Sequence, residues 1–118
     1  MHESRTENAQ PGDRVYRGAR GGIVTVDGMK LDPRLDLANH SPTGFMWGYG
    51  GSGPAQLALA ILCDHLGDDR RALKAYQTFK FRVIAQIPMN ESWTMTSEQV
   101  QQQADAIEAE IDPGAAPS

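Results

Sequence analysis

The feature that most constrains the fold is a glycine-rich run, Gly-Tyr-Gly-Gly-Ser-Gly-Pro, over residues 48–54. Four glycines within six positions disfavour both helix and strand, because glycine loses more backbone freedom on folding than any other residue. The run stands directly before residues 55–66, where leucine, isoleucine and alanine occupy nearly all sides of a helical wheel. A helix of that kind is buried. The sequence therefore predicts a tight loop that opens the central buried helix.

Capping residues mark both ends of this predicted helix. Ser52 or Gly53 can cap its N-terminus, and Pro54 suits the first helical position. Gln56 can reach back toward the cap, as in a capping box. Gly67 follows the last apolar residue and ends the helix.

Two further helices are predicted after the first. Asp68 and Asp69 can cap the start of the second helix. Its apolar residues recur at spacings of three and four over residues 72–87, and Pro88 ends this amphipathic stripe. Thr96 caps a third helix, with Gln99 three positions further on. Its apolar stripe over residues 100–111 is thin, which predicts a peripheral position.

The segment before the glycine-rich run has the pattern of a small antiparallel sheet. Residues 15–18 can begin the first strand, and β-branched residues 23–26 are followed by an Asp-Gly pair at 27–28, which is a strong hairpin signal. Residues 45–49 alternate large rings with small or flexible residues, which predicts a strand or extended segment with its rings on one face. Residues 89–95 are predicted as a loop or short strand.

The predicted architecture is α+β. We expect a small antiparallel sheet from about residue 15 to residue 49, packed against two central helices with a third at the edge. At 118 residues the chain has the size of one domain. We expect a single globular domain over residues 14–111, with flexible polar tails over 1–13 and 112–118.

Composition favours a cytoplasmic protein that does not enter membranes. Cys63 is the only cysteine, so no internal disulfide can form. We see neither an apolar signal region at the start nor an apolar run of membrane-spanning length. The net charge of -4 gives no general reason to expect nucleic-acid binding. No cofactor is predicted, and the spacing of Cys63 and the three histidines predicts no metal site.

The first candidate site is the glycine-rich run itself. Free backbone N–H groups at a helix N-terminus bind anions, so Gly50, Gly51, Ser52 and Gly53 are candidate ligand-binding residues. The run lacks the lysine of a P-loop, and its context does not fit the dinucleotide-binding fingerprint. The competing interpretation is that the glycines permit a tight turn and close packing, and we favour it on these grounds.

Asn39, His40 and Lys80 complete this candidate ligand site. Asn39 and His40 lie just before the run and would give it polar or hydrolytic character, although neighbours in sequence do not make a catalytic triad. Lys80 falls inside the apolar stripe of the second helix, so it must reach the edge or find a carboxylate. Asp36 and Asp64 are the first candidate partners, although we favour a lysine whose stem packs on the core while its ammonium reaches the edge.

A second candidate site is the outer face of the second helix. It carries four basic side chains and one aromatic ring, namely Arg70, Arg71, Lys74, Arg82 and Phe81. Such a face can bind nucleic acid or an acidic protein surface, or it can simply be solvated. Residues 91–118 carry six acids and no base, so they can also neutralise it within the molecule.

The block Asn-His-Ser-Pro-Thr-Gly-Phe-Met-Trp-Gly-Tyr-Gly-Gly-Ser-Gly-Pro-Ala-Gln over residues 39–56, with the apolar run to residue 62, resembles one known family. It is the domain-of-unknown-function family 6166, small proteins of bacteria, phages and plasmids. The resemblance extends to four shorter segments, residues 16–18, 76–80, 83–85 and 93–96. It implies a cytosolic single-domain protein, often of mobile-element origin, with no established reaction.

These observations favour a non-enzymatic protein-interaction module of mobile-element origin, with a host- or defence-modulating role. Its partner is expected to be a protein. One alternative is a small anionic-ligand-binding or hydrolytic site at the glycine-rich run. The other is nucleic-acid binding through the basic second helix.

Overall fold

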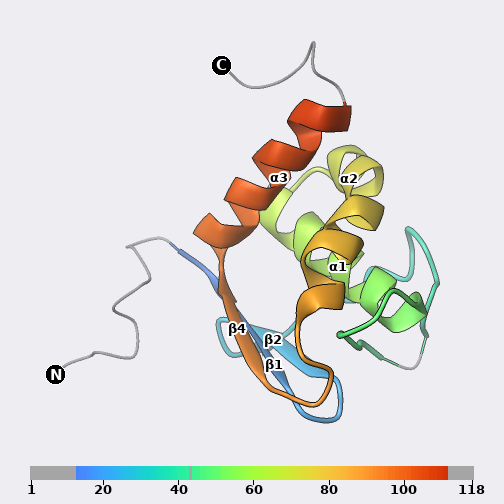
Figure 1. Cartoon of the computed structure of the whole chain (residues 1–118), viewed down its shortest axis with the longest axis vertical. Coiled ribbons are helices and arrows are strands. Elements are labelled where there is room, and N and C mark those ends of the chain that lie inside the picture. Colours follow the sequence, from blue (N-terminus) through green and yellow to red (C-terminus); the bar gives the residue numbers. More distant parts are fainter. Residues whose placement is uncertain (1–12, 43, 112–118) are drawn as a thin grey trace, which may run out of the picture.

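A computed structural model of the chain describes residues 13–42 and 44–111. A small antiparallel sheet packs against a layer of three helices (Figure 1). This is the α+β fold that the sequence predicts. The elements, in chain order, are β1 (Val15–Ala19), β2 (Ile23–Val26), β3 (Met29–Lys30), α1 (Ser52–Leu66), α2 (Asp69–Arg82), the 3-10 turn η2 (Ile84–Gln86), β4 (Trp93–Thr96) and α3 (Ser97–Ile111).

The sheet has the strand order β3-β2-β1-β4 with every pair antiparallel. Tyr16 lies opposite Val26 on one side and Met95 on the other, and all three are buried against the helices. Asp27 and Gly28 both have positive φ, as the predicted two-residue hairpin turn requires. The alternation along β1 and β2 thus places one face of the sheet on the core.

The fourth strand is β4, and residues 45–49 do not join the sheet. The edge of β1 that remains free after pairing with β2 is occupied by Trp93–Thr96. Gly48 has a φ of +90°, which interrupts an extended backbone, and its N–H donates to the Ile84 carbonyl. Phe45 and Trp47 are buried as the alternation predicts, but Tyr49 is 41% exposed.

Helix α1 is the centre of the molecule. Residues 53–63 are all buried, which confirms the helix that the sequence places there. The helix begins at the N-cap Gly51, however, and no side chain caps it. The predicted capping role of Gln56 is therefore wrong, because its side chain turns away to bind another part of the chain.

Helices α2 and α3 begin as predicted. The Asp68 carboxylate accepts from the Arg71 N–H at the start of α2. At the start of α3, Thr96 and Gln99 bond each other's backbone N–H groups in a capping box. α3 buries a thin stripe of Val100, Ala104 and Ile107, in keeping with its place at the edge of the helical layer.

The predicted tails lie outside the described residues, apart from Asp13. Within residues 13–42 and 44–111, none of the helices has the length and apolar character needed to cross a membrane.

Candidate interaction site at the glycine-rich loop

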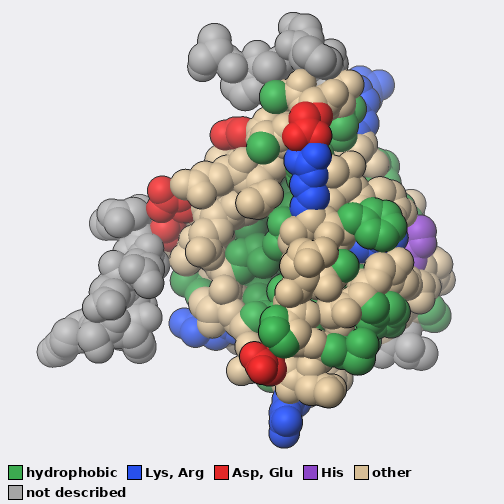
Figure 2. All heavy atoms as spheres, viewed as in Figure 1, with side chains coloured by type: hydrophobic (Ala, Val, Ile, Leu, Met, Phe, Trp, Pro, Cys, Tyr) green, Lys and Arg blue, Asp and Glu red, His purple; other side chains and the backbone are tan. Residues whose placement is uncertain are grey.

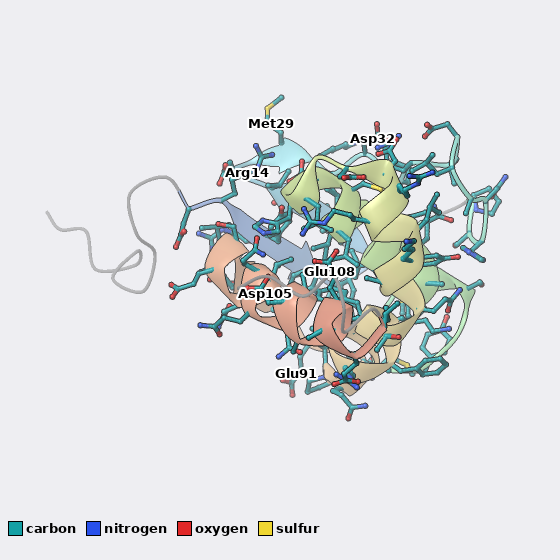
Figure 3. All side chains as sticks on the ribbon, turned by 90° about the horizontal axis from the view of Figure 1, so that it is seen from above. Arg14, Met29, Asp32, Glu91, Asp105 and Glu108 are labelled. Carbon is teal, nitrogen blue, oxygen red and sulfur yellow. The ribbon has the colours of Figure 1, made fainter. Side chains whose placement is uncertain are left out.

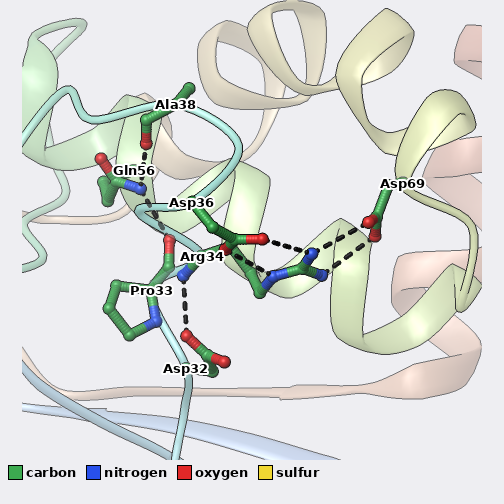
Figure 4. A network of polar contacts seen from close by, with 7 residues as sticks. All are labelled: Asp32, Pro33, Arg34, Asp36, Ala38, Gln56 and Asp69. Atoms are coloured by element: carbon green, nitrogen blue, oxygen red, sulfur yellow. Dashed lines mark hydrogen bonds and ion pairs between the residues drawn. The ribbon is translucent and has the colours of Figure 1, made fainter.

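The long connection between β3 and α1 is held in place by the buried amide of Gln56 (Figure 4). Its Nε2 donates to the carbonyls of Pro33 and Ala38, at 2.6 and 2.9 Å. Its Oε1 accepts from the backbone N–H groups of His40 and Ser41. A primary amide has two donors and two acceptor sites. Gln56 uses all four on backbone groups, so one side chain fixes the path of the connection.

Arg34 attaches the same connection to the start of α2. Its guanidinium forms paired hydrogen bonds with both Asp36 and Asp69 (Figure 4). The hydrogen bonds from Arg34, and to a lesser extent its positive charge, lower the pKa of both carboxyl groups. Asp32 accepts from the Arg34 N–H, which suits the positive φ of that residue. Asp36, which the sequence offers as a partner for Lys80, is thereby engaged elsewhere.

From Arg34 onward the connection runs along α2 in the same direction as the helix. Arg34 meets Asp69 at the start of the helix, and the His40 ring meets Tyr76 in its middle. Gly48 then bonds the carbonyl of Ile84, just after the helix ends. The glycine-rich loop therefore lies against the C-terminal end of α2.

His40 contributes to this attachment. Its Nε2 lies 2.7 Å from the Tyr76 hydroxyl, and the two rings are in contact. The Ser41 hydroxyl donates to the Gly44 carbonyl at 2.6 Å. Among the described residues, no hydrogen bond joins His40 to Ser41, Ser52 or Lys80, and the Asn39 side chain is exposed without one. The candidate residues of the hydrolytic interpretation are thus not joined to one another.

The glycines of the loop are packed closely against other segments. A Cβ added at Gly48 would lie 2.6 Å from the Met89 Cα, and one at Gly50 would lie 2.7 Å from the Phe81 ring. One added at Gly53 would lie 2.8 Å from the Met46 Cβ. Real Cβ atoms do not come this close to other heavy atoms. The geometry agrees with the packing interpretation, in which these positions require glycine.

Three large apolar side chains surround this loop and remain exposed. Tyr49, Phe81 and Met89 are 41%, 56% and 45% exposed and come from the loop, α2 and the segment before β4. Each contacts a glycine of the loop, because the ring of Tyr49 lies over Gly51 while Phe81 and Met89 meet Gly50 and Gly48. We call these three residues the glycine-loop patch. Figure 2 shows several hydrophobic side chains exposed together on one face of the molecule.

The patch continues through Met89 into an open pocket of about 420 Å³. The pocket is lined by Met46, Trp47, Met89 and Arg20, together with small neighbours. The Nε of Arg20 donates to the carbonyl of Asn90. Methionines give such a surface adaptable apolar contacts, and Arg20 adds a cation at its rim.

Lys80 lies beneath the patch. It is 7% exposed, and its Nζ is 4.1 Å from the centre of the Phe81 ring. Within residues 13–42 and 44–111 it forms no hydrogen bond or ion pair. The predicted partner Asp64 instead accepts from Arg14 and Tyr16. Neither candidate carboxylate therefore pairs with Lys80, and the face of Phe81 lies against its ammonium instead.

The predicted basic face of α2 is partly neutralised by α3. Arg71 forms two hydrogen bonds of 2.8 Å with Glu108, and Arg82 pairs with Glu110. Figure 3 shows Glu108 on α3, the helix that supplies both acids. Arg70 and Lys74 are exposed and form no ion pair within the described residues. The expected neutralisation by the acidic C-terminal segment is confirmed for two of the four cations.

Cys63 and His65 serve the core and the helix contacts. Burial raises the pKa of the Cys63 thiol to about 11. His65 bonds Gln101 of α3, so it ties two helices together. Within the part of the chain that the structure describes, no group of three potential metal ligands comes together.

Comparison with known proteins identifies the family. A model described as a family of unknown function, DUF6166, matches residues 12–106. The chain belongs to this family. The DUF6166 match includes all four strands, α1 and α2, and it ends within α3 before Glu108 and Glu110. No curated protein and no solved structure matches the chain.

The sequence indicated that Phe81 is an exposed ring and that Lys80 lies on the buried side of its helix. It did not indicate that Tyr49 and Met89 are exposed. Tyr49 looked like the third ring of a buried alternation. The glycines on either side of it carried the contrary signal, because they provide no side chains that could cover its ring. Met89 carried no comparable local signal, since its contact with Gly48 joins segments forty residues apart.

Proposed function

We propose that this DUF6166 protein is a non-enzymatic protein-interaction module whose partner binds the glycine-loop patch. The observation that carries the proposal is the convergence of Tyr49, Phe81 and Met89 from three segments onto one exposed surface. Aromatic side chains and methionine are enriched at protein interfaces. A few such anchors supply most of the binding free energy.

The segments beneath the patch are held in place by contacts within the protein, without a partner. Gln56 and Arg34 hold the connection that leads to the loop, and the glycines pack against Phe81 and Met89 without intervening side chains. A surface ordered in advance loses less conformational entropy when it binds. This favours a binding role for the loop over a role as a mere link between β3 and α1.

The family resemblance favours a partner from a bacterial cell. A mobile-element origin, a cytoplasmic location and a host- or defence-modulating role belong to the same proposal. A small protein with an exposed set of apolar anchors suits that role, because it can occupy a surface of a host protein without catalysing a reaction.

Nucleic-acid binding through α2 receives less support. Arg71 and Arg82 are paired with glutamates of α3, which leaves Arg70 and Lys74 on that face. Non-specific binding to nucleic acid depends on many phosphate contacts, and two exposed cations offer few.

The proposal is tested with affinity purification from bacteria followed by reconstitution from purified components. Tyr49→Ser and Phe81→Ser remove anchors of the patch, and Leu73→Ser is the matched control because Leu73 is 40% exposed on α2 outside the patch. We expect a partner that binds the wild type and Leu73→Ser alike, and binds both patch variants at least about tenfold more weakly. A reconstituted partner that binds all four proteins with equal affinity would refute the proposal.

A further inference from the structure

The start of α1 offers unpaired hydrogen-bond donors beside the patch. Its N-cap Gly51 has no side chain, and its first turn contains no acidic residue. The backbone N–H groups of Ser52 and Gly53 have no acceptor within the described residues. Such groups and the helix dipole favour a negative charge at this end of the helix.

Lys80 provides an independent observation on the Phe81 ring, which contacts the same loop. Its ammonium lies over the face of Phe81, and the edge of the same ring abuts Gly50, two residues before α1 begins. The side chain is more than nine-tenths buried and has neither a hydrogen bond nor an ion pair within the described residues. An ammonium that is largely shielded from water and has no carboxylate beside it is costly. The site thus favours an anion that residues 13–42 and 44–111 do not supply.

The ammonium is nevertheless within reach of a ligand. Among the described residues, the indole Nε1 of Trp93 is the single fully buried side-chain nitrogen or oxygen without a partner. The Nζ of Lys80 also has no hydrogen-bond partner among those residues, but it is not fully buried. It therefore retains contact with solvent. The C-terminal dipole of α2 stabilises a cation in its last turn, but it supplies no hydrogen-bond acceptor for the three protons of the ammonium.

We propose that the partner inserts a carboxylate side chain beside Phe81, between the Lys80 ammonium and the uncapped start of α1. An apolar residue of the same partner segment then covers the exposed rings of the glycine-loop patch. Arg20, at the rim of the adjoining pocket, gives the surface a second cation for an acidic segment. This inference rests on the proposed function and adds the chemistry of the partner: an acidic peptide segment with an apolar anchor.

The test uses two peptide probes that differ only in one charge, acetyl-Phe-Asp-amide and acetyl-Phe-Asn-amide, titrated into the ¹⁵N-labelled full chain. Amide shifts of Gly50, Gly51, Ser52 and Gly53 report binding. We expect the aspartyl probe to bind about tenfold more tightly, as charge-assisted hydrogen bonds predict. Inorganic phosphate is titrated separately and is expected to bind more weakly than the aspartyl probe.

Variants test whether Lys80 is the source of the preference for the aspartyl probe. Lys80→Met is expected to bring the affinity ratio of the two probes to about one, since a neutral chain of similar length remains. Lys74→Met removes an exposed lysine of the same helix and should keep the ratio. Phe81→Ser should weaken both probes. Thermal unfolding of Lys80→Met checks that the fold persists, and we expect it to be no less stable than the wild type.

Three results with the peptide probes would overturn the inference. They are equal affinity of the two probes for the wild type, an unchanged ratio in Lys80→Met, or no shift from either probe at millimolar concentration. Tighter binding of phosphate than of the aspartyl probe would overturn it in favour of a site for small anions. If both probes bind equally and Phe81→Ser weakens them, the carboxylate inference fails while the proposed function stands.

Discussion

At the scale of single residues, Gln56 and the loop glycines determine where the glycine-loop patch lies. Gln56 sits in a helix that is otherwise apolar, and its amide satisfies four backbone groups of the connection. The glycines allow Phe81 and Met89 to pack directly on the backbone. Both features position the patch, although neither is part of it.

Replacement of Gln56 by leucine should destabilise the protein strongly. Four buried or half-buried backbone groups lose their partner, so we expect a loss of about 3 kcal/mol or more in the free energy of unfolding. Urea denaturation measures it. Gln77→Leu is the control, because Gln77 is exposed on α2 and has no hydrogen bond within the described residues. A loss below about 1 kcal/mol for Gln56→Leu would contradict the role given to its amide.

Two glycines have nearly equal φ, so a comparison of their alanine variants distinguishes the cost of backbone strain from the cost of close packing. Gly21 (φ +89°) has nothing within 4 Å of an added Cβ, whereas Gly48 (φ +90°) has the Met89 backbone there. We expect Gly21→Ala to cost about 1 kcal/mol and Gly48→Ala to cost at least about 1 kcal/mol more, by the strain and overpacking that each adds. Equal losses in thermal unfolding would show that Met89 does not pack on the loop as described.

At the scale of secondary-structure elements, local signals were enough for the helices but not for the fourth strand. The caps at Asp68 and Thr96 and the stop at Gly67 depend on neighbouring residues, and all are confirmed. β4 pairs with β1 across some eighty residues of sequence. Its pairing competes with the similar pattern of residues 45–49, and no local rule decides which segment occupies the edge.

The distinction between local signals and long-range contacts also applies to the site. The apolar stripe of α2 showed that Lys80 is buried, because periodicity is local. The absence of a carboxylate beside it depends on Arg34 and Arg14 having taken Asp36 and Asp64. That outcome follows from the three-dimensional arrangement, and the sequence therefore predicted the burial of Lys80 but not its surroundings.

The contact between α2 and α3 should weaken in acid. Arg71 lowers the pKa of Glu108 from its ordinary 4.5. A lowered folded pKa stabilises the folded state above pH 4.5, and this contribution is lost as the pH falls through the folded value. We expect wild type and Glu108→Gln to differ by no more than about 1 kcal/mol at pH 7, since the pair is partly exposed. The difference should disappear in acid, and a constant difference from pH 7 to pH 2 would contradict this.

Removing the acids of α3 should expose the basic face of α2. In the double variant Glu108→Gln/Glu110→Gln, Arg71 and Arg82 become available to phosphates. We expect tighter binding to duplex DNA in a gel-shift assay, with a salt dependence steeper by up to about two charges. Glu98→Gln, on an exposed part of α3, is the control. If the double variant and the control bind DNA equally, the ion pairs do not mask this face.

At the scale of the whole molecule, the patch lies where three parts of the fold meet. The β3–α1 connection, the end of α2 and the segment before β4 each supply one of its anchors. The residues matched by the family extend over all three parts, and they stop before the glutamates that neutralise α2. We therefore propose the glycine-rich loop, and not the basic helix face, as the binding surface of this DUF6166 protein.

Site-specific photo-cross-linking in bacteria tests that assignment most directly. A benzophenone amino acid is placed at Tyr49 in the patch or at Leu73 outside it, in the otherwise unchanged full chain. The account predicts a discrete cross-linked partner from position 49, absent from position 73 and lost when Phe81→Ser is added. The same adducts from both positions, or an adduct at position 49 that Phe81→Ser leaves unchanged, would contradict it.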